Sequence, residues 1–122
     1  MEKVFNGSCH CGEIKFTFVS DLSRVGRCNC SLCLKRSAVM AYTEAGKFAL
    51  ISGENRLNCY QFNTMQAKHY FCRACGIYTH HHPRTQKQTI AVNLSCLSLT
   101  AEELAGLTIQ EINGAKLSRN DK

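Results

Sequence analysis

The chain has 122 residues, which is the length of one domain and lets it bury roughly 65% of the surface that the unfolded chain exposes. Its 44% hydrophobic and 20% charged residues are typical of a globular protein and exclude a disordered or collagen-like chain. The formal net charge of +6 comes from scattered lysines and arginines without a dense basic block, so we do not expect a nucleic-acid partner.

Neither a membrane span nor a secretory signal is expected. No stretch approaches the roughly 18 apolar residues of a membrane helix, and the residues after Met1 lack the apolar core of a signal peptide. We therefore expect a cytoplasmic protein with a single domain over residues 1–122. Its core is expected to span about residues 5–114, followed by a polar tail at 115–122.

Short strands are expected along most of the chain. Residues 13–19 alternate strictly between polar and apolar side chains, with Ile14, Phe16 and Phe18 on one face, which predicts a half-buried strand. Shorter β-like runs, separated by turn-forming residues, lie at residues 39–43, 48–51, 57–62, 69–71, 90–94 and 108–112. The pattern predicts a mainly β domain.

One short helix is expected near the C-terminus. Thr100 and Glu103 have the spacing of a capping box, with Thr100 as the N-cap and Glu103 at position N3. Leu104 and Leu107 provide a small apolar face, and Gly106 is expected to end the helix after about two turns.

Nine cysteines are the most informative feature of the sequence. An odd number of cysteines in a chain without an expected secretory signal argues against a disulfide framework. Seven of them fall into three short groups at residues 9–11, 28–33 and 72–75, and such spacings are typical of metal ligands. Seven bound thiolates add −7 and two Zn²⁺ add +4, so metal binding lowers the formal charge from +6 to +3.

The first and third groups have the same form, because each contains two cysteines followed by a glycine. These residues are Cys9, Cys11 and Gly12 in the first group and Cys72, Cys75 and Gly76 in the third. A turn of this kind places two sulfurs on one face of a tight loop, and glycine accepts the positive φ with which the chain leaves it. We therefore predict that the four cysteines form one closed site for a structural zinc.

The middle group differs, because three potential thiolates, Cys28, Cys30 and Cys33, fall within six residues. Three protein ligands leave the fourth position of a tetrahedral zinc open, as in catalytic sites. Zinc held by three thiolates is a weak Lewis acid and suits a soft substrate thiolate better than water. The middle group therefore predicts chemistry at a sulfur atom.

An alternative is that a fourth ligand closes the middle site and makes it structural. The candidates for this ligand are His69, Cys59, Cys96 and the later histidines. Where Cys59 and Cys96 are not ligands, we interpret them as small buried hydrophobic residues.

Two further groups are candidates for contacts with a substrate. Lys35 and Arg36 directly follow the middle cysteines and are candidates for binding a substrate carboxylate, although exposed loop cations are common. His80, His81 and His82 precede Pro83, and we interpret them as the solvated end of a strand. The less favoured interpretation is a proton-transfer group near the open zinc position.

The three cysteine groups, in this order, resemble the glutathione-dependent formaldehyde-activating enzyme family. The similar segments lie at residues 7–12, 28–33, 71–81 and 92–97, so the resemblance extends from about residue 5 to residue 114. It implies a β-tent of small antiparallel sheets organised around zinc, here with one short C-terminal helix. It also implies the ligand sets described above, which are Cys9, Cys11, Cys72 and Cys75 for a structural zinc and Cys28, Cys30 and Cys33 for a catalytic zinc.

The resemblance further implies a zinc-dependent carbon–sulfur lyase similar to S-(hydroxymethyl)glutathione synthase. Such an enzyme joins a thiol such as glutathione to an aldehyde such as formaldehyde, with the thiol bound at the open position of the middle zinc. The alternative hypothesis is a zinc-stabilised interaction module without catalysis, because the family also includes relatives of centromere protein V. A redox or metal sensor ranks below both, since bound zinc protects thiolates from oxidation.

Overall fold

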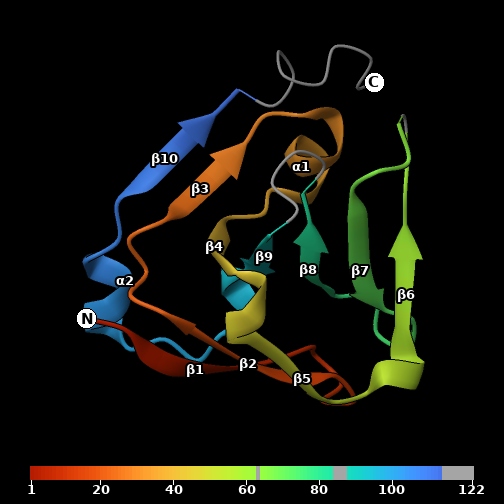
Figure 1. Ribbon diagram of the computed structural model, residues 1–122, viewed down its shortest axis with the longest axis horizontal. Helices are drawn as coiled ribbons and strands as arrows, with labels where there is room; N and C mark the ends of the chain where they lie inside the picture. The colour runs from red at the N-terminus through yellow and green to blue at the C-terminus, as the bar shows by residue number, and fades with distance from the viewer. Residues whose placement is uncertain (63, 84–87, 114–122) are drawn as a thin grey trace.

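The computed structural model describes residues 1–62, 64–83 and 88–113, which form two β-sheets with short connecting helices and turns (Figure 1). The predicted polar tail at 115–122 lies outside these residues. The predicted mainly β class with small sheets is confirmed. None of the helices in the described ranges is long and apolar enough to cross a membrane.

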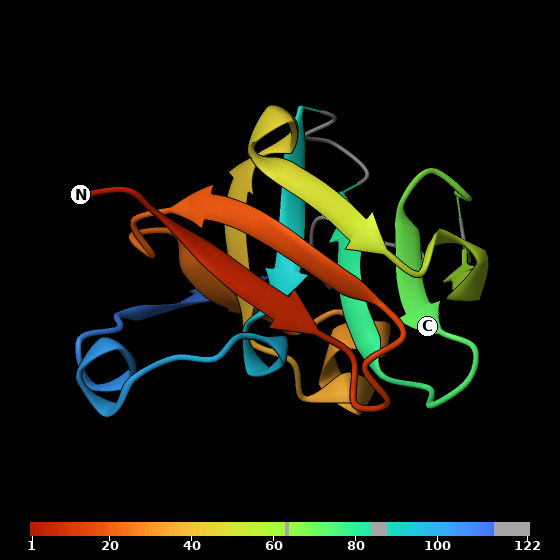
Figure 2. The same cartoon turned by 90° about the horizontal axis from the view of Figure 1, so that it is seen from below.

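The smaller sheet has three antiparallel strands and lies across the larger sheet (Figure 2). Its strands, in spatial order, are β1 (Lys3–Ser8), β2 (Lys15–Ser20) and β5 (Phe48–Ser52). The predicted alternation is confirmed in β2, where Phe16 and Phe18 are buried and Thr17 and Val19 are partly exposed. One face of β2 therefore contributes to the core.

The larger sheet has seven strands. In spatial order they are β10 (Ile109–Ile112), β3 (Val25–Cys28), β4 (Met40–Glu44), β9 (Thr89–Asn93), β8 (Tyr78–His82), β7 (Lys68–Cys72) and β6 (Leu57–Tyr60). Neighbouring strands are antiparallel except β10 and β3, which run parallel with Ile112 opposite Cys28. β10 therefore supports the strand that leads directly into the middle cysteine group.

The main hydrophobic core lies between the two sheets. Phe5, Phe16 and Phe18 from the smaller sheet pack with residues from the larger sheet, which are Val25, Ala41 and Val92. The rings of Phe5 and Phe18 are 5.5 Å apart between centroids. Because each buried side chain of this size contributes about 1.5–3 kcal/mol, this core is the main apolar support for both sheets.

The structure contains two short α-helices. The predicted one is α2 (Ala101–Ala105), and its capping box is present: the Glu103 amide donates to Thr100 Oγ1 at 3.1 Å, and the Thr100 amide donates to Glu103 Oε1 at 2.9 Å. The other, α1 (Ser31–Arg36), was not predicted from the sequence, because its six residues are too few to show a helical period. Three 3₁₀ turns complete the fold: η1 (Ala45–Lys47), η2 (Glu54–Arg56) and η3 (Leu94–Cys96).

Two strands, β1 and β3, were also not predicted. β3 has only four residues and contains Gly26, which normally weakens a strand. A Cβ atom at Gly26 would lie 2.6 Å from Ile112 Cδ1, so glycine here allows β10 to approach β3 closely. The reason for this glycine is visible only once β3 and β10 are placed side by side.

Candidate functional site

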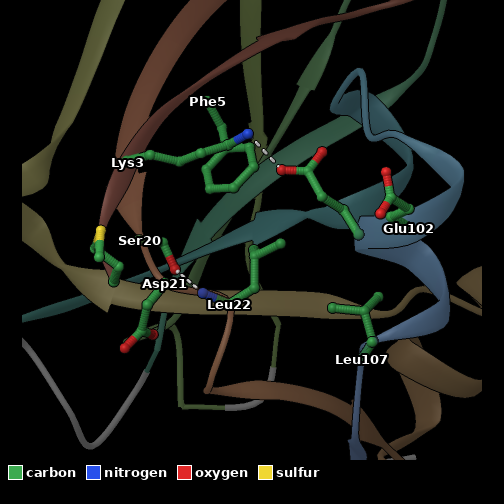
Figure 3. Close-up of a pocket in the computed structure, with 10 residues that line it drawn as sticks. Lys3, Phe5, Ser20, Asp21, Leu22, Glu102 and Leu107 are labelled. Carbon is green, nitrogen blue, oxygen red and sulfur yellow. Dashed lines mark hydrogen bonds and ion pairs between the residues drawn. The ribbon is translucent and has the colours of Figure 1, made fainter.

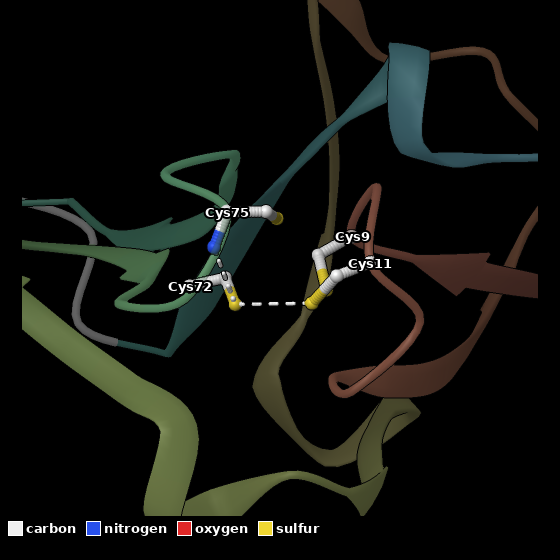
Figure 4. A group of neighbouring side chains, drawn as sticks. All are labelled: Cys9, Cys11, Cys72 and Cys75. Atoms are coloured by element: carbon white, nitrogen blue, oxygen red, sulfur yellow. Dashed lines mark hydrogen bonds between the residues drawn. The ribbon is translucent and has the colours of Figure 1, made fainter.

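Four cysteines from distant parts of the chain converge where β7 meets the loop between β1 and β2 (Figure 4). The four sulfurs of this outer cluster, from Cys9, Cys11, Cys72 and Cys75, all lie within 4.8 Å of one another. Cys11 Sγ is 3.6 Å from Cys9 Sγ and 3.7 Å from Cys72 Sγ. Sulfurs about 2.3 Å from a tetrahedral zinc would be about 3.8 Å apart, so the spacing fits that ion.

Backbone amides around the outer cluster donate hydrogen bonds to its sulfurs. The Ile14 amide donates to Cys9 Sγ at 3.3 Å, and the Ala74 amide donates to Cys72 Sγ at 3.4 Å. A hydrogen bond from the backbone of Ile77 lowers the pKa of the Cys75 thiol to about 6. Because metal ligands must be deprotonated, these donors support metal binding.

Both predicted turn glycines have the required conformation. Gly12 and Gly76 each have a φ of +82°, in the left-handed region that side-chain-bearing residues rarely adopt. They end the two turns that carry the sulfurs of the outer cluster, so the backbone conformation predicted from the local sequence is present at both turns.

The middle cluster is formed by Cys28, Cys30 and Cys33, whose sulfurs also lie within 4.8 Å of one another. Cys28 ends β3, and Cys30 is the N-cap of α1, where its sulfur accepts from the Cys33 amide at 3.4 Å. The Cys30 amide in turn donates to Cys28 Sγ at 3.4 Å. Hydrogen bonding and charge repulsion from Cys28 and Cys30 raise the pKa of the Cys33 thiol, so three thiolates here need a nearby cation.

No fourth histidine, cysteine or carboxylate within the described ranges joins the middle cluster. Cys59, one of the proposed fourth ligands, is exposed on the edge strand β6, so its predicted burial is wrong. Cys96 is half-buried and its thiol donates to the Tyr78 carbonyl at 3.4 Å. His69 lies on β7 and belongs to neither cluster.

Two tyrosines, the half-buried Tyr42 and the buried Tyr78, lie near the middle cluster. Burial, followed by the charges of Cys28 and Cys33, raises the pKa of Tyr42 to about 12. Burial and the charge of Cys33 also raise the pKa of Tyr78 well above its ordinary value. Both hydroxyls therefore stay protonated at neutral pH and add no negative charge beside the thiolates.

The two cations that follow the middle cysteines lie in different environments. Lys35 is exposed, whereas the guanidinium carbon of Arg36 lies 3.9 Å from the centroid of the Tyr78 ring. The hydroxyl of Tyr78 forms a hydrogen bond with His81 Nδ1. Arg36, Tyr78 and His81 thus form a continuous polar group next to the cluster.

The interpretation of the three histidines as a solvated strand end is wrong. His80 is 4% exposed and His81 is 8% exposed, because β8 lies in the interior of the seven-stranded sheet between β7 and β9. The His80 ring packs 4.7 Å from Phe48 and 4.8 Å from Tyr70 between centroids, and its Nδ1 is 2.9 Å from Thr79 Oγ1. Hydrogen bonds with Thr79 and Tyr78 thus offset part of the free-energy cost of burying the imidazole rings of His80 and His81.

Acid is expected to destabilise the fold through these histidines. Burial lowers the pKa of His80 to about 4 and that of His81 to about 3. The unfolded chain binds protons below about pH 6.5, so this stability is fully present above that pH and is lost as the pH falls towards the folded values. We expect a loss on the order of 1–2 kcal/mol per histidine between about pH 7 and pH 5.

Urea unfolding at several pH values, with bound zinc measured in the same samples, checks this expectation. The variant His80→Phe keeps an aromatic ring among Phe48 and Tyr70 and is expected to show a shallower pH dependence. A free energy of unfolding that stays level while metal remains bound would contradict it.

A separate hollow of about 200 Å³ lies beside β1 and α2 (Figure 3). Phe5, Leu22 and Leu107 form its apolar part, and Lys3 Nζ lies 2.5 Å from Glu103 Oε2 at its rim. Its described lining contains neither cysteine nor histidine. The cysteines of the two clusters therefore lie elsewhere in the molecule.

Comparisons with known proteins agree with this arrangement. The sequence profile of a family described as glutathione-dependent formaldehyde-activating enzyme matches residues 4–109, which include every cysteine of the two clusters. A crystal structure of a Rhodobacter sphaeroides protein is 34% identical, over 90% of this chain and 99% of that chain, with a TM-score of 0.75. The likeness thus extends over nearly the whole of both chains.

Proposed function

Because the chain belongs to the glutathione-dependent formaldehyde-activating enzyme family, we propose that it is a zinc-dependent carbon–sulfur lyase. Its substrates in this proposal are a small thiol, such as glutathione, and an aldehyde, such as formaldehyde. Family membership by itself supports a function related to glutathione and formaldehyde. The observation that carries the finer proposal is the middle cluster, where three sulfurs converge and no fourth ligand from the described residues joins them.

The two clusters have different roles in this proposal. Cys9, Cys11, Cys72 and Cys75 would hold a structural zinc, since four thiolates complete a tetrahedral shell. Cys28, Cys30 and Cys33 would hold the catalytic zinc and leave one position for the substrate sulfur. The chemistry fits a cytoplasmic protein, in which cysteines remain reduced.

Zinc in the middle cluster would lower the pKa of an added thiol and hold its sulfur as a thiolate. The sulfur then forms a bond to the carbonyl carbon, the π electron pair of the C=O bond moves to the oxygen, and the oxygen takes up the proton that the thiol released. In the reverse direction the carbon–sulfur bond breaks, and aldehyde and thiol are regenerated.

The chain's own residues prepare this reaction by fixing charge and geometry. The amides of Cys30 and Cys33 donate hydrogen bonds to the sulfurs of Cys28 and Cys30 and so fix the positions of these sulfurs. The neutral hydroxyls of Tyr42 and Tyr78 add no further negative charge near them. These two hydroxyls therefore add nothing to the repulsion that the three sulfurs exert on an approaching thiolate.

The proposal is tested by measuring how fast a thiol–aldehyde adduct forms and breaks in the presence of the protein. Carbon-13 exchange spectroscopy on labelled formaldehyde and glutathione at equilibrium gives this rate directly, and the protein-free sample supplies the uncatalysed rate. We expect the zinc-loaded protein to accelerate exchange for at least one thiol–aldehyde pair in a panel.

A cobalt-substituted sample provides the matching binding experiment. A thiol that enters the open position changes the d–d bands of the middle cobalt. The lyase proposal is wrong if no thiol changes the d–d bands and the protein accelerates exchange for no thiol–aldehyde pair. That result would favour a non-catalytic interaction module.

A further inference from the structure

Arg36 is the last residue of α1 and lies on the same side of this helix as Cys33. The two residues are three positions apart, a spacing that brings side chains together on one helix face. Cys33 is buried and Arg36 is half-buried, whereas the neighbouring Lys35 is exposed. The helix therefore directs one cation inward, towards the middle cluster, and leaves the other in solvent.

The position of the Arg36 guanidinium is fixed by neutral partners. It stacks 3.9 Å from the centroid of the buried Tyr78 ring, and the Tyr78 hydroxyl is in turn bonded to His81 Nδ1. None of the ion pairs that the structure gives for residues 1–62, 64–83 and 88–113 involves Arg36. The guanidinium is thus held in place, but its charge has no carboxylate partner within those ranges.

The Nη1 atom of Arg36 is buried and forms no hydrogen bond within the described part of the chain. The sulfurs of the middle cluster do not serve as its acceptors either. A buried donor without an acceptor costs about 1–3 kcal/mol, and more when the group is charged, so native proteins rarely keep one without a reason. An acceptor supplied by a bound molecule provides such a reason.

We propose that Arg36 Nη1 binds a negatively charged oxygen carried close to the sulfur of the thiol that occupies the middle cluster. This inference rests on the proposed function, in which that cluster takes up a thiol. Two sources supply such an oxygen: the alkoxide of the thiol–aldehyde adduct, and the carboxylate of a short mercapto acid. A planar guanidinium suits both, since its N–H groups make charge-assisted hydrogen bonds with oxygen anions.

In the reaction proposed above, the π pair of the carbonyl moves to the oxygen as the carbon–sulfur bond forms. A donor already fixed at that position stabilises the developing charge without having to reorganise. The stacking on Tyr78 provides this fixed position. Arg36 would then be a catalytic residue, whereas the exposed Lys35 would contribute nothing to the step.

Direct binding measurements on zinc-loaded protein test the proposal without relying on turnover. Mercaptoacetate carries a carboxylate beside its sulfur, and 2-mercaptoethanol has similar size without the charge. By titration calorimetry we expect the wild-type protein to bind mercaptoacetate about 10- to 100-fold more tightly. Arg36→Met, which keeps an unbranched stem over Tyr78, should abolish the preference, and Lys35→Met, with the same change in charge, should retain it.

Arg36→Lys gives a second variant that keeps the charge but loses the planar fork, and it should recover only part of the preference. The source of the oxygen follows from exchange rates with 2-mercaptoethanol and formaldehyde. A loss of about tenfold or more in Arg36→Met identifies the adduct oxygen. A loss confined to mercapto acids identifies the carboxylate, and either result supports the proposal.

Three results would overturn it. One is a wild-type protein that binds both thiols equally, together with an Arg36→Met variant that keeps the wild-type exchange rate for 2-mercaptoethanol and formaldehyde. Another is a preference for mercaptoacetate that survives in Arg36→Met. The third is a lower zinc affinity of Arg36→Met in chelator competition with an unchanged thiol preference, which would make Arg36 only a counter-charge for the thiolates. If neither thiol binds to any of the proteins, the proposed thiol site itself is wrong, and this outcome is distinct from equal binding.

Discussion

Replacing Cys11 by serine is expected to destabilise the domain strongly. Cys11 is exposed, so the substitution deletes a ligand of the proposed structural zinc while removing almost no buried apolar surface. Structural zinc sites contribute about 10–16 kcal/mol of binding free energy, which is as large as the whole net stability of a typical domain, about 5–15 kcal/mol. Weakening the site by one ligand should therefore lower the free energy of unfolding by about 3 kcal/mol or more.

Cys59→Ser is the matched control, because Cys59 is also exposed but lies outside both clusters. Cys59→Ser should have the melting temperature and the zinc content per chain of the wild-type protein. Cys11→Ser should melt well below both. Equal melting temperatures for the two variants would show that the outer cluster does not stabilise the fold through metal.

Cys30→Ser is expected to abolish thiol–aldehyde exchange while leaving the domain folded. The substitution removes one of the three ligands that would hold the catalytic zinc, and serine keeps an oxygen that can still accept the Cys33 amide at the N-cap of α1. The exchange rate should fall by at least about 100-fold, as for the loss of an essential catalytic group. Zinc content should fall by about one ion per chain, since the outer cluster is untouched.

Carbon-13 exchange spectroscopy and elemental analysis on the same preparations check this result, again with Cys59→Ser as the control. Full exchange activity in Cys30→Ser for every active pair would remove the middle cluster from the mechanism.

The sequence predicts those parts of the site whose geometry is local. Cys72 and Cys75 are joined by one tight turn, and Gly76 has the backbone conformation that the turn needs, so spacing alone is informative. The cap of α2 is equally local, because Thr100 and Glu103 bond to each other's backbone. Such features depend on the neighbouring residues and very little on the rest of the fold.

Features that depend on the order of strands could not be predicted from one sequence. Three consecutive histidines before a proline have the composition of a solvated segment, yet β8 is covered by a strand on each side and His80 and His81 are buried. The prediction for Cys59 is wrong in the opposite direction: it was expected to be buried, but β6 is an edge strand and Cys59 is exposed. Neither outcome follows until the seven strands have been placed in order.

The inward position of Arg36 also could not be predicted from the sequence alone. The sequence shows two cations in a row, and nothing local distinguishes Lys35 from Arg36. Their difference arises from the orientation of α1, which is set by burial of Cys33 and by contact of Arg36 with Tyr78 on a strand more than 40 residues away along the chain.

The two clusters also differ in how far apart their ligands lie along the chain, and this affects when each is formed. Cys28, Cys30 and Cys33 are close neighbours, whereas the contact between Cys11 and Cys72 spans 61 residues. A short segment can chelate metal in the denatured ensemble at little entropic cost, but the longer loop must first be closed by folding. A metal that also binds the unfolded chain adds less to the folding equilibrium. Denaturant should therefore release the outer ion at the unfolding midpoint, while the middle ion leaves the chain later.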